Sequence, residues 1–326
     1  MPRVLLIEPT IRPVGVELLQ NQAEVGFAPD GREATLIDRL SSGDFDAVVT
    51  RVERMTRPVI EAARGLKVIG QHGVGVDNID VAAASERGIL VLNAPTANAV
   101  SVAEHAVMLV LALCRQVIAA DRAVRSGDFP YRDRHIPVEL NGKTLFVAGF
   151  GRAGRETARR FRLGFNMRVL AFDPGVAASE IRAEGAEPAS LEEGFANADA
   201  ITLHMPLIPA TRRMVSAALI ARMKPTAYLV NTARGGVVDQ TALVDALKAG
   251  RIAGAGLDVF DPEPPGTDDP ILALPNLIAS PHFAGDTLEA KDRCSKLIAG
   301  QVLTALSGGL PDHIVNREVI APRAAS

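Results

Sequence analysis

The sequence predicts an α/β protein with two doubly wound parallel sheets, and three observations lead to that prediction. Short, strongly apolar runs alternate with helix-like segments almost throughout the chain. These runs are apolar at successive positions, which is typical of strands in a parallel sheet that helices cover on both faces. The alternation begins anew at residue 144, so two such sheets are expected rather than one.

The strand-like segments form two groups. The first group comprises 3–8, 46–50, 66–71 and 89–93, with helices expected at 56–64 and 77–87. The second group comprises 144–150, 168–173, 200–205, 227–232, 253–259 and 276–280. Helical segments separate the strands within each group, so each group is expected to form its own sheet.

Two helices differ from the others. Residues 99–126 form one long candidate that is apolar nearly all round in its middle, so something besides a single sheet must cover it. A subunit interface and complete burial within the chain explain that pattern equally well. The last helix is expected at 286–307, with Asp286 as its N-cap and Glu289 as the capping-box partner.

The restart at residue 144 indicates two domains, although the helix at 99–126 continues into the second group. We therefore expect a discontinuous first domain, 1–98 plus 286–326, and a second domain at 99–285. In that arrangement the last helix returns to the domain in which the chain begins. A sequential split near residue 140 is the alternative.

The composition excludes several classes of function. The 326 residues are 48% hydrophobic and 22% charged, as in globular proteins, and 35 basic and 38 acidic residues give a net charge of −3. That charge provides no general attraction to nucleic acid or to an anionic membrane. Because Trp is absent and aromatic residues make up 4% of the chain, no platform for stacking bases is visible.

Targeting and metal signals are also missing from the sequence. The longest apolar run, 106–114, is too short to span a bilayer, and the first residues resemble a strand rather than a signal peptide. Cys114 and Cys294 have neither metal-binding nor redox spacing. We therefore expect buried thiols, a cytoplasmic protein and no metal site.

The segment "TLFVAGFGRAGRETARRF" is the most specific local signal. Gly149, Gly151 and Gly154 follow a strand and open a helix, as in a dinucleotide-binding βαβ unit of the Rossmann type. The first glycine permits a tight turn, the second lets the backbone approach a pyrophosphate, and the third allows close packing of helix on strand. The next strand ends in Asp173, 22 residues after Gly151, where a carboxylate binds ribose hydroxyls and repels a 2′-phosphate. The loop therefore predicts NAD as the cofactor.

A second glycine pair lies in "VIGQHGVGVDN". Gly73 and Gly75 also follow a strand, but no third glycine completes the motif and no acid follows at the expected spacing of about twenty residues. Their backbone N–H groups form either a nest for a small anion or a plain tight turn.

Four ionisable residues stand at or just after the ends of later strands: Arg234, Asp258, Glu263 and His282. The carboxyl ends of parallel strands meet where doubly wound folds bind ligands, so we expect these groups to converge. An arginine can hold a carboxylate with two hydrogen bonds and polarise the neighbouring carbonyl. A histidine can give a proton to the forming alkoxide, and a glutamate bonded to it orients the ring. With a dinucleotide loop, this set predicts hydride transfer to a keto acid.

These motifs resemble the D-isomer-specific 2-hydroxyacid dehydrogenase family over nearly the whole chain. The matching stretches are "GVGVDNIDVAAASERGILVLNAPTANAVSVAEHAV", "VELNGKTLFVAGFGRAGRE", "NTARGGVVDQTAL", "GLDVFDPEPP" and "PHFAG". The first of them is most similar to phosphoglycerate dehydrogenases. The resemblance implies two Rossmann- or flavodoxin-like domains with the active site in the cleft between them. It also implies a homodimer in which the helix after "NAPTAN" is prominent.

The resemblance implies roles for individual residues. Arg234 would bind the substrate carboxylate and carbonyl, His282 would be the acid/base, and Glu263 would be its partner. Asp258 would face the nicotinamide. The residues implied to bind the cofactor are Gly149, Gly151, Arg152, Ala153, Gly154, Asp173, Thr232, Ala233, Asp258 and Gly285. Those implied to bind the substrate are Arg51, Gly73, Val74, Gly75 and Asn98, the last in the turn between the domains.

Other interpretations of the same residues stay open. A glyoxylate/hydroxypyruvate reductase or a broad 2-keto acid reductase would carry the same catalytic set. An NAD(H)-sensing, corepressor-like binding protein on this fold is the alternative from outside the enzymes. The resemblance further implies that a chain ending at residue 326 lacks the C-terminal regulatory domain, and the serine control, of longer phosphoglycerate dehydrogenases.

Three positions bear on specificity. Phe283 stands where a smaller aliphatic residue is usual in the family, and Asp286 stands where Ser or Ala is common. Arg51 follows a strand, and in the resembling phosphoglycerate dehydrogenases an arginine at this position helps to hold the phosphorylated substrate. We expect Arg51 to contact an anionic or strongly polar substrate tail, 3-phosphoglycerate first. The alternative is a solvated arginine beside Glu53.

Overall fold

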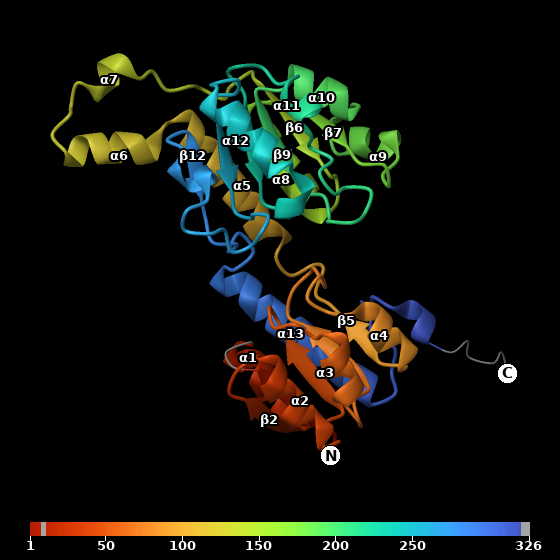
Figure 1. Cartoon of the computed structure of the whole chain (residues 1–326). Helices are drawn as coiled ribbons and strands as arrows, with labels where there is room; N and C mark the ends of the chain where they lie inside the picture. The colour runs from red at the N-terminus through yellow and green to blue at the C-terminus, as the bar shows by residue number, and fades with distance from the viewer. Residues whose placement is uncertain (8–10, 321–326) are drawn as a thin grey trace. The chain divides into compact units, whose positions relative to one another are not determined.

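The computed structural model describes residues 1–7 and 11–320, so residue 8 of the expected first strand lies outside the described part. The chain forms two compact units, each with its own parallel sheet (Figure 1). The first unit comprises Met1–Asn98 and Asp286–Ser326, and the second comprises Ala99–Gly285. The chain therefore passes between the units twice, after Asn98 and after Gly285.

The first unit is a five-stranded sheet in the order β2-β1-β3-β4-β5, with every neighbouring pair parallel. Its strands are β1 (Arg3–Ile7), β2 (Glu24–Ala28), β3 (Ala47–Thr50), β4 (Val68–Gln71) and β5 (Leu90–Leu92). Its helices are α1 (Pro13–Gln20), α2 (Glu33–Ser41), α3 (Arg57–Ala62), α4 (Val81–Glu86) and α13 (Leu288–Leu306), with the short η3 (Arg317–Val319) after them.

Helices bury both faces of this sheet. Val4 and Leu6 of β1 belong to the core cluster that contains Val302 of α13, whereas Leu5 and Ile7 belong to the cluster that contains side chains of α2, α3 and α4. Successive residues of a strand point to opposite faces, so a strand between two helix layers must be apolar at every position. In Figure 1 the blue helix α13, from near the C-terminus, lies against the red and orange N-terminal part of the chain. It thereby forms part of the first unit.

The second unit is a seven-stranded parallel sheet in the order β12-β11-β10-β9-β6-β7-β8. Its strands are β6 (Thr144–Ala148), β7 (Arg168–Phe172), β8 (Glu187–Pro188), β9 (Ala200–Leu203), β10 (Tyr228–Asn231), β11 (Gly254–Leu257) and β12 (Leu277–Ala279). Its helices are α5 (Ala99–Cys114), α6 (Val117–Arg125), α7 (Tyr131–Arg134), α8 (Arg152–Phe165), α9 (Ala178–Ala183), α10 (Leu191–Asn197), α11 (Ala217–Ile220), α12 (Gln240–Lys248), and the short η1 (Gly235–Val237) and η2 (Pro270–Ala273).

The strand order of the second unit reverses at β6. From β6 the sheet continues through β7 and β8 on one side and through β9 to β12 on the other. Side chains of α5 and α8 fill the core on one face, and those of α10, α11 and α12 fill it on the other. Doubly wound sheets bind ligands where the order reverses, so the carboxyl ends of β6 and β9 mark the expected cofactor site. The predicted fold class is confirmed.

Two strands, β2 and β8, are absent from the sequence-based expectation. Both lie at the edges of their sheets. β8 is only two residues long and ends in Pro188, and β2 contains Gly26 and has one fully buried residue, Ala28. An edge strand needs apolar side chains on few positions, so it carries little of the pattern by which buried strands are recognised.

The expectation of a single helix at 99–126 is wrong. The helix breaks between α5 and α6, which are bent by 55° at Gln116, a residue with φ of +51°. α5 packs against α8, β10 and β11 on one side, whereas its Val100 and Met108 are exposed. α6 also exposes Val117 and Val124, and Figure 1 shows α6 and α7 projecting from the second unit.

The expected N-cap at Asp286 is also wrong. α13 begins at Leu288, and the Thr287 hydroxyl accepts a hydrogen bond from the Ala290 N–H at 3.1 Å. Thr287 is therefore the cap. The carboxylate of Asp286 is left for other contacts.

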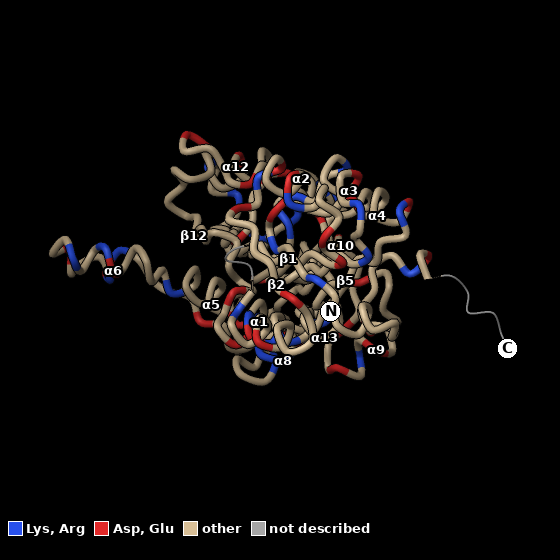
Figure 2. The backbone as a smooth tube through the Cα atoms, turned by 90° about the horizontal axis from the view of Figure 1, so that it is seen from below, with Lys and Arg blue, Asp and Glu red and all other residues tan. Residues whose placement is uncertain are grey.

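Charge distribution and helix length bear on possible membrane and surface contacts. Figure 2 shows Lys and Arg interspersed with Asp and Glu along the described backbone. Within residues 1–7 and 11–320, no single helix is long and apolar enough to cross a membrane. α5 and α6 together have the length and composition of a membrane-spanning segment, but they form a bent pair, and half of the residues of α5 are buried in the second unit.

Candidate active site

The glycine loop between β6 and α8 has the geometry of a phosphate cradle. Gly149 has φ of +93°, and a Cβ there would lie 2.7 Å from the carbonyl carbon of His204. A Cβ at Gly154 would lie 2.0 Å from the Gly149 oxygen. A Cβ at Gly151, by contrast, would meet no described atom within 4 Å. The outer two glycines are thus required by the turn and the packing, whereas Gly151 leaves space for a ligand.

The residues around this loop suit the rest of a dinucleotide. Arg152 and Ala153 open α8, whose first N–H groups are available to phosphates at the positive end of the helix dipole. Asp173 follows β7 and accepts hydrogen bonds from the N–H groups of Phe150 at 2.8 Å and Gly175 at 2.9 Å. Its carboxylate is therefore held beside the loop, where the ribose of a bound dinucleotide would need it.

Buried polar atoms without partners occur at the same end of the sheet. Both ring nitrogens of His204 and the hydroxyl of Thr232 are buried and have no hydrogen-bond partner in the described part of the chain. Burial lowers the pKa of His204 to about 4, so its ring is neutral at physiological pH. The next residue after Thr232, Ala233, donates its N–H to Asn231 Oδ1 at 3.0 Å. Unsatisfied buried groups fit a polar ligand, so the residues present suit the predicted cofactor.

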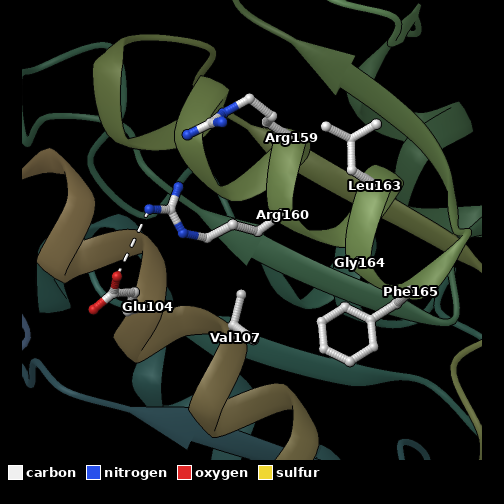
Figure 3. Close-up of a pocket in the computed structure, with 7 residues that line it drawn as sticks. All are labelled: Glu104, Val107, Arg159, Arg160, Leu163, Gly164 and Phe165. Carbon is white, nitrogen blue, oxygen red and sulfur yellow. Dashed lines mark ion pairs between the residues drawn. The ribbon is translucent and has the colours of Figure 1, made fainter.

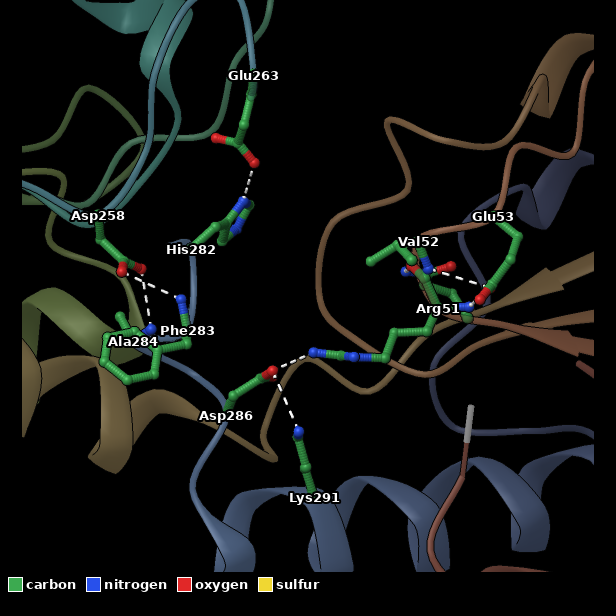
Figure 4. Close-up of polar contacts among 11 residues, drawn as sticks. Arg51, Val52, Glu53, Asp258, Glu263, His282, Phe283, Ala284, Asp286 and Lys291 are labelled. Carbon is green, nitrogen blue, oxygen red and sulfur yellow. Dashed lines mark hydrogen bonds and ion pairs between the residues drawn. The ribbon is translucent and has the colours of Figure 1, made fainter. Parts of the chain in front are cut away.

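Glu263 and His282 are in direct contact (Figure 4). Nδ1 of His282 lies 2.5 Å from Oε1 of Glu263. Burial alone would raise the pKa of Glu263, but the hydrogen bond and charge of His282, the Phe260 N–H and the charge of Arg234 outweigh it, so the pKa is lowered. Glu263 is therefore ionised at neutral pH, and its charge is lost only as the pH falls through that lowered pKa. Because Nδ1 is occupied, Nε2 is the ring nitrogen available to a substrate.

The backbone at His282 adopts a conformation that residues other than glycine rarely adopt. Its φ is +52°, in the left-handed region, and such residues persist only where neighbouring contacts hold them. Here Asp258 provides those contacts. Its backbone oxygen accepts the His282 N–H at 2.8 Å, and its carboxylate accepts the N–H groups of Phe283 at 3.1 Å and Ala284 at 2.9 Å.

Asp258 has a further line of contacts that sequence reasoning missed. The Ser280 hydroxyl donates to Asp258 Oδ1 at 2.6 Å, and His105 Nε2 lies 2.9 Å from the same hydroxyl. The Asp258 side chain is 1% exposed, and its carboxylate accepts hydrogen bonds from the N–H groups of Phe283 and Ala284 in the loop that carries His282. Its predicted contact with nicotinamide stays a prediction. Ser280 stands two residues before His282, but no local pattern distinguishes it from an ordinary loop serine.

Arg234 follows β10 at the same end of the sheet. Asn231 holds its turn by donating from Nδ2 to the Arg234 carbonyl at 2.9 Å. A Cβ at Gly235 would lie 1.8 Å from the Phe260 oxygen, so glycine is required for the two loops to pack. The charge of Arg234 is among those that lower the pKa of Glu263. The ends of β10, β11 and β12 thus bring a guanidinium, a carboxylate and an imidazole together.

The first unit places the other predicted residues at the ends of its own strands. Arg51 follows β3, and its guanidinium forms an ion pair with Asp286 (Figure 4). The alternative of a solvated Arg51 side chain beside Glu53 is not what the structure has. The Glu53 carboxylate instead accepts the backbone N–H of Arg51 at 2.8 Å. The Arg51 side chain is therefore partnered by Asp286 rather than solvated beside Glu53. Its contact with a substrate tail stays a prediction.

The glycine pair after β4 forms a tight turn. The Gly73 N–H donates to the Gln71 oxygen at 2.9 Å, whereas the N–H groups of Val74 and Gly75 donate to no residue that the structure describes. Two amides remain for an anion, but the carboxylate contact predicted here is untested. Asn98 and Gly285 are the residues at which the chain leaves each unit, and their predicted ligand contacts likewise remain predictions.

A separate hollow of about 500 Å³ lies between α5 and α8. Figure 3 shows Glu104 and Arg160 at its polar side and the apolar Val107, Leu163 and Phe165 around the rest. The Arg160 guanidinium lies 3.7 Å from the Glu104 carboxylate. None of the predicted catalytic or cofactor residues lines it. It is therefore not the candidate active site.

Comparisons with known proteins bear on this geometry. Residues 107–284 match the sequence profile of the D-isomer specific 2-hydroxyacid dehydrogenase, NAD binding domain. The chain is 41% identical over its whole length to D-3-phosphoglycerate dehydrogenase 2 of Arabidopsis thaliana, of which it covers 52%. It thus spans about half the length of that relative. It is 39% identical to the glyoxylate reductase of Pyrococcus furiosus, over 95% of this chain and 94% of that protein.

Solved structures of similar fold cover nearly the full chain. A glyoxylate reductase from Paecilomyes thermophila superposes with a TM-score of 0.88 at 30% identity, over 97% of this chain and 99% of that chain. D-Lactate dehydrogenase from Aquifex aeolicus, solved with NAD and lactic acid, has a TM-score of 0.85 at 29% identity and covers 96% and 98% of the two chains.

Proposed function

Because this chain belongs to the D-isomer-specific 2-hydroxyacid dehydrogenase family, we propose that it is an NAD-dependent oxidoreductase acting on the CH–OH group of a 2-hydroxy acid. In the reverse direction it would reduce the matching 2-keto acid. The observation that carries this proposal is the Glu263–His282 contact of 2.5 Å, at the strand ends that also carry Arg234. An imidazole held by an ionised carboxylate is the acid/base that the reaction needs.

Each residue of the set has a separate task in the proposed reaction. The bound dinucleotide supplies the hydride that the carbonyl carbon receives. Arg234 binds the substrate carboxylate with two hydrogen bonds and polarises the adjacent carbonyl. His282 donates its proton from Nε2 to the carbonyl oxygen as the alkoxide forms, and takes the proton back in the oxidation. Glu263 holds Nδ1, and its negative charge stabilises the protonated ring.

Replacing Glu263 by Gln should shift the pH dependence of keto acid reduction. A neutral amide stabilises a protonated imidazole less than a carboxylate does, so the alkaline fall in kcat should move to lower pH. The measurement is a pH–rate profile of NADH oxidation for both proteins. Glu192→Gln, an exposed residue of α10 in the same unit, serves as the control. An unchanged profile for Glu263→Gln would show that the carboxylate does not act on the histidine.

The cofactor preference should depend on Asp173. We expect NAD to be preferred over NADP, because the Asp173 carboxylate repels a 2′-phosphate and Pro174 and Gly175 provide no basic residue to bind one. Asp173→Ala should relax this preference mainly through KM. The measurement is kcat/KM with both cofactors, and comparable values for the wild-type protein would contradict the assignment.

Two substrate classes fit the relatives. Phosphoglycerate dehydrogenases are about 40% identical to the chain, which makes 3-phosphoglycerate one candidate substrate. The match covers little more than half of their own length. The glyoxylate reductase of Pyrococcus furiosus matches over nearly its whole length, which supports a glyoxylate/hydroxypyruvate or broad 2-keto acid reductase as the second candidate.

A homodimer is the proposed assembly. α6 and the segment after it expose Val124, Phe129 and Ile136, and the hollow between α5 and α8 exposes Leu163. A second copy of the chain would cover this apolar surface, which a monomer rarely presents to water. Light scattering that gives the mass of a single chain, 34.4 kDa, would contradict the proposal.

The activity itself is tested with a panel of substrates. NADH or NADPH is mixed with hydroxypyruvate, 3-phosphohydroxypyruvate, glyoxylate or pyruvate, and the loss of reduced cofactor is followed. Oxidation that requires the keto acid supports the enzyme. An NAD(H)-sensing binding protein would bind NADH, detectable by its fluorescence, without oxidising it in the presence of any member of the panel.

A further inference from the structure

Arg51 is held by a carboxylate of its own chain. Its guanidinium pairs with Asp286, and Lys291 Nζ lies 3.3 Å from the same carboxylate oxygen, so one acid is shared by two bases (Figure 4). All three residues belong to the first unit. The arginine that an anionic substrate tail would need is therefore already engaged.

The local sequence makes Asp286 available for this contact. Thr287 caps α13, so the carboxylate of Asp286 is not used by the helix. The other nearby acid, Glu53, is committed to the backbone N–H groups of Arg51 and Val52 and to the Thr50 hydroxyl. Asp286 is thus the acid that neutralises the Arg51 guanidinium.

The pair is only partly accessible to water. The side chains of Arg51 and Asp286 are 29% and 26% exposed. The buried side chains of His72 and Cys294 lie close enough for their pKa values to respond to both charges. Charges in such surroundings interact more strongly than charges on an open surface, which favours the pair.

We propose that Asp286 is a specificity-determining residue, which neutralises Arg51 and directs the enzyme toward 2-keto and 2-hydroxy acids with small, uncharged tails. The inference rests on the proposed function, since it concerns the tail of the substrate of that reaction. A phosphate at Arg51 would have to displace Asp286 and remain beside its negative charge. A hydrogen or a hydroxymethyl tail meets no such repulsion. This reverses the preference for a phosphorylated tail that Arg51 alone predicts.

Asp286→Asn tests the proposal, because it keeps the size of the side chain and removes its charge. KM for 3-phosphohydroxypyruvate should fall by roughly tenfold or more, since Arg51 and Lys291 then both face the phosphate without a competing carboxylate. KM for glyoxylate should stay within about twofold, because that substrate has no tail to respond to the charge. Adding Arg51→Ala to Asp286→Asn should abolish the gain.

Asp292→Asn is the matched control. Asp292 also lies in the N-terminal part of α13, but it pairs with Arg12 at 3.0 Å and not with Arg51. This variant removes one negative charge from the same helix and should leave the ratio of the two KM values unchanged. An equal shift in both variants would mean that general charge, rather than the Arg51 pair, governs the tail.

Calorimetric binding of 3-phosphoglycerate separates this proposal from the proposed activity. Asp286→Asn should bind it more tightly than the wild-type protein, whether or not any substrate is turned over. If the panel shows no oxidation of NADH, the proposed function fails while this measurement still tests the charge. Unchanged or weaker binding by Asp286→Asn, or a wild-type preference for the phosphorylated substrate, would overturn the role of Asp286.

Discussion

Replacing His282 by Ala should lower kcat by roughly 10²–10⁴, the usual contribution of a positioned acid or base. The side chain is half-exposed, its Nδ1 is held by Glu263, and Nε2 is left to exchange a proton with the substrate oxygen. NADH should still bind, because the loop at Gly149–Gly154 and Asp173 is built from other strands. Stopped-flow turnover and NADH fluorescence measure the two effects separately.

The backbone at this position requires a second variant. With φ of +52°, alanine is strained there, whereas asparagine is among the residues that tolerate the left-handed region. His282→Asn should lose activity to a similar degree while keeping the loop in place. Near-normal turnover in either variant would remove His282 from the mechanism.

Replacing Arg234 by Lys should lower kcat/KM by roughly 10- to 100-fold even though the charge is kept. A lysine ammonium cannot form the two parallel hydrogen bonds of a guanidinium, and one hydrogen bond to a charged group is worth about 1.5–3 kcal/mol. The loss should appear with every keto acid of the panel, because all of them carry the carboxylate that Arg234 binds.

Arg212→Lys is the control for this variant. Arg212 belongs to the same unit and lies 4.0 Å from Asp261, but its side chain is 58% exposed and it has no predicted role in the site. Its replacement should leave kcat/KM unchanged. If Lys at position 234 works as well as Arg, the substrate carboxylate is held elsewhere.

The core of the fold could be predicted from the sequence because its strands are buried on both faces. A strand such as β6 or β10 has no polar face, so each one is visible as a continuous apolar run. The edge strands β2 and β8 lack that constraint and were missed. The helix break at Gln116 was missed because no proline or glycine marks the bend.

The candidate site divides in the same way. The glycine loop and Asp173 belong to one βαβ unit, so their spacing along the chain is tied to their spacing in space. Glu263 and His282 are 19 residues apart on different loops, and their places after strand ends, rather than their spacing, predicted that they converge. Their contact exists because β11 and β12 are neighbours and because Asp258 holds the loop of His282.

The sequence by itself determined the two parallel sheets, the dinucleotide loop and the set of ionisable residues at the strand ends. These follow from periodicity and from backbone requirements that act over a few residues. Only the tertiary structure showed which partner each charge takes. Thr287 rather than Asp286 caps α13, and Asp286 pairs with Arg51, which follows the distant strand β3. Contacts between such distant segments depend on how the chain is folded, and no local pattern encodes them.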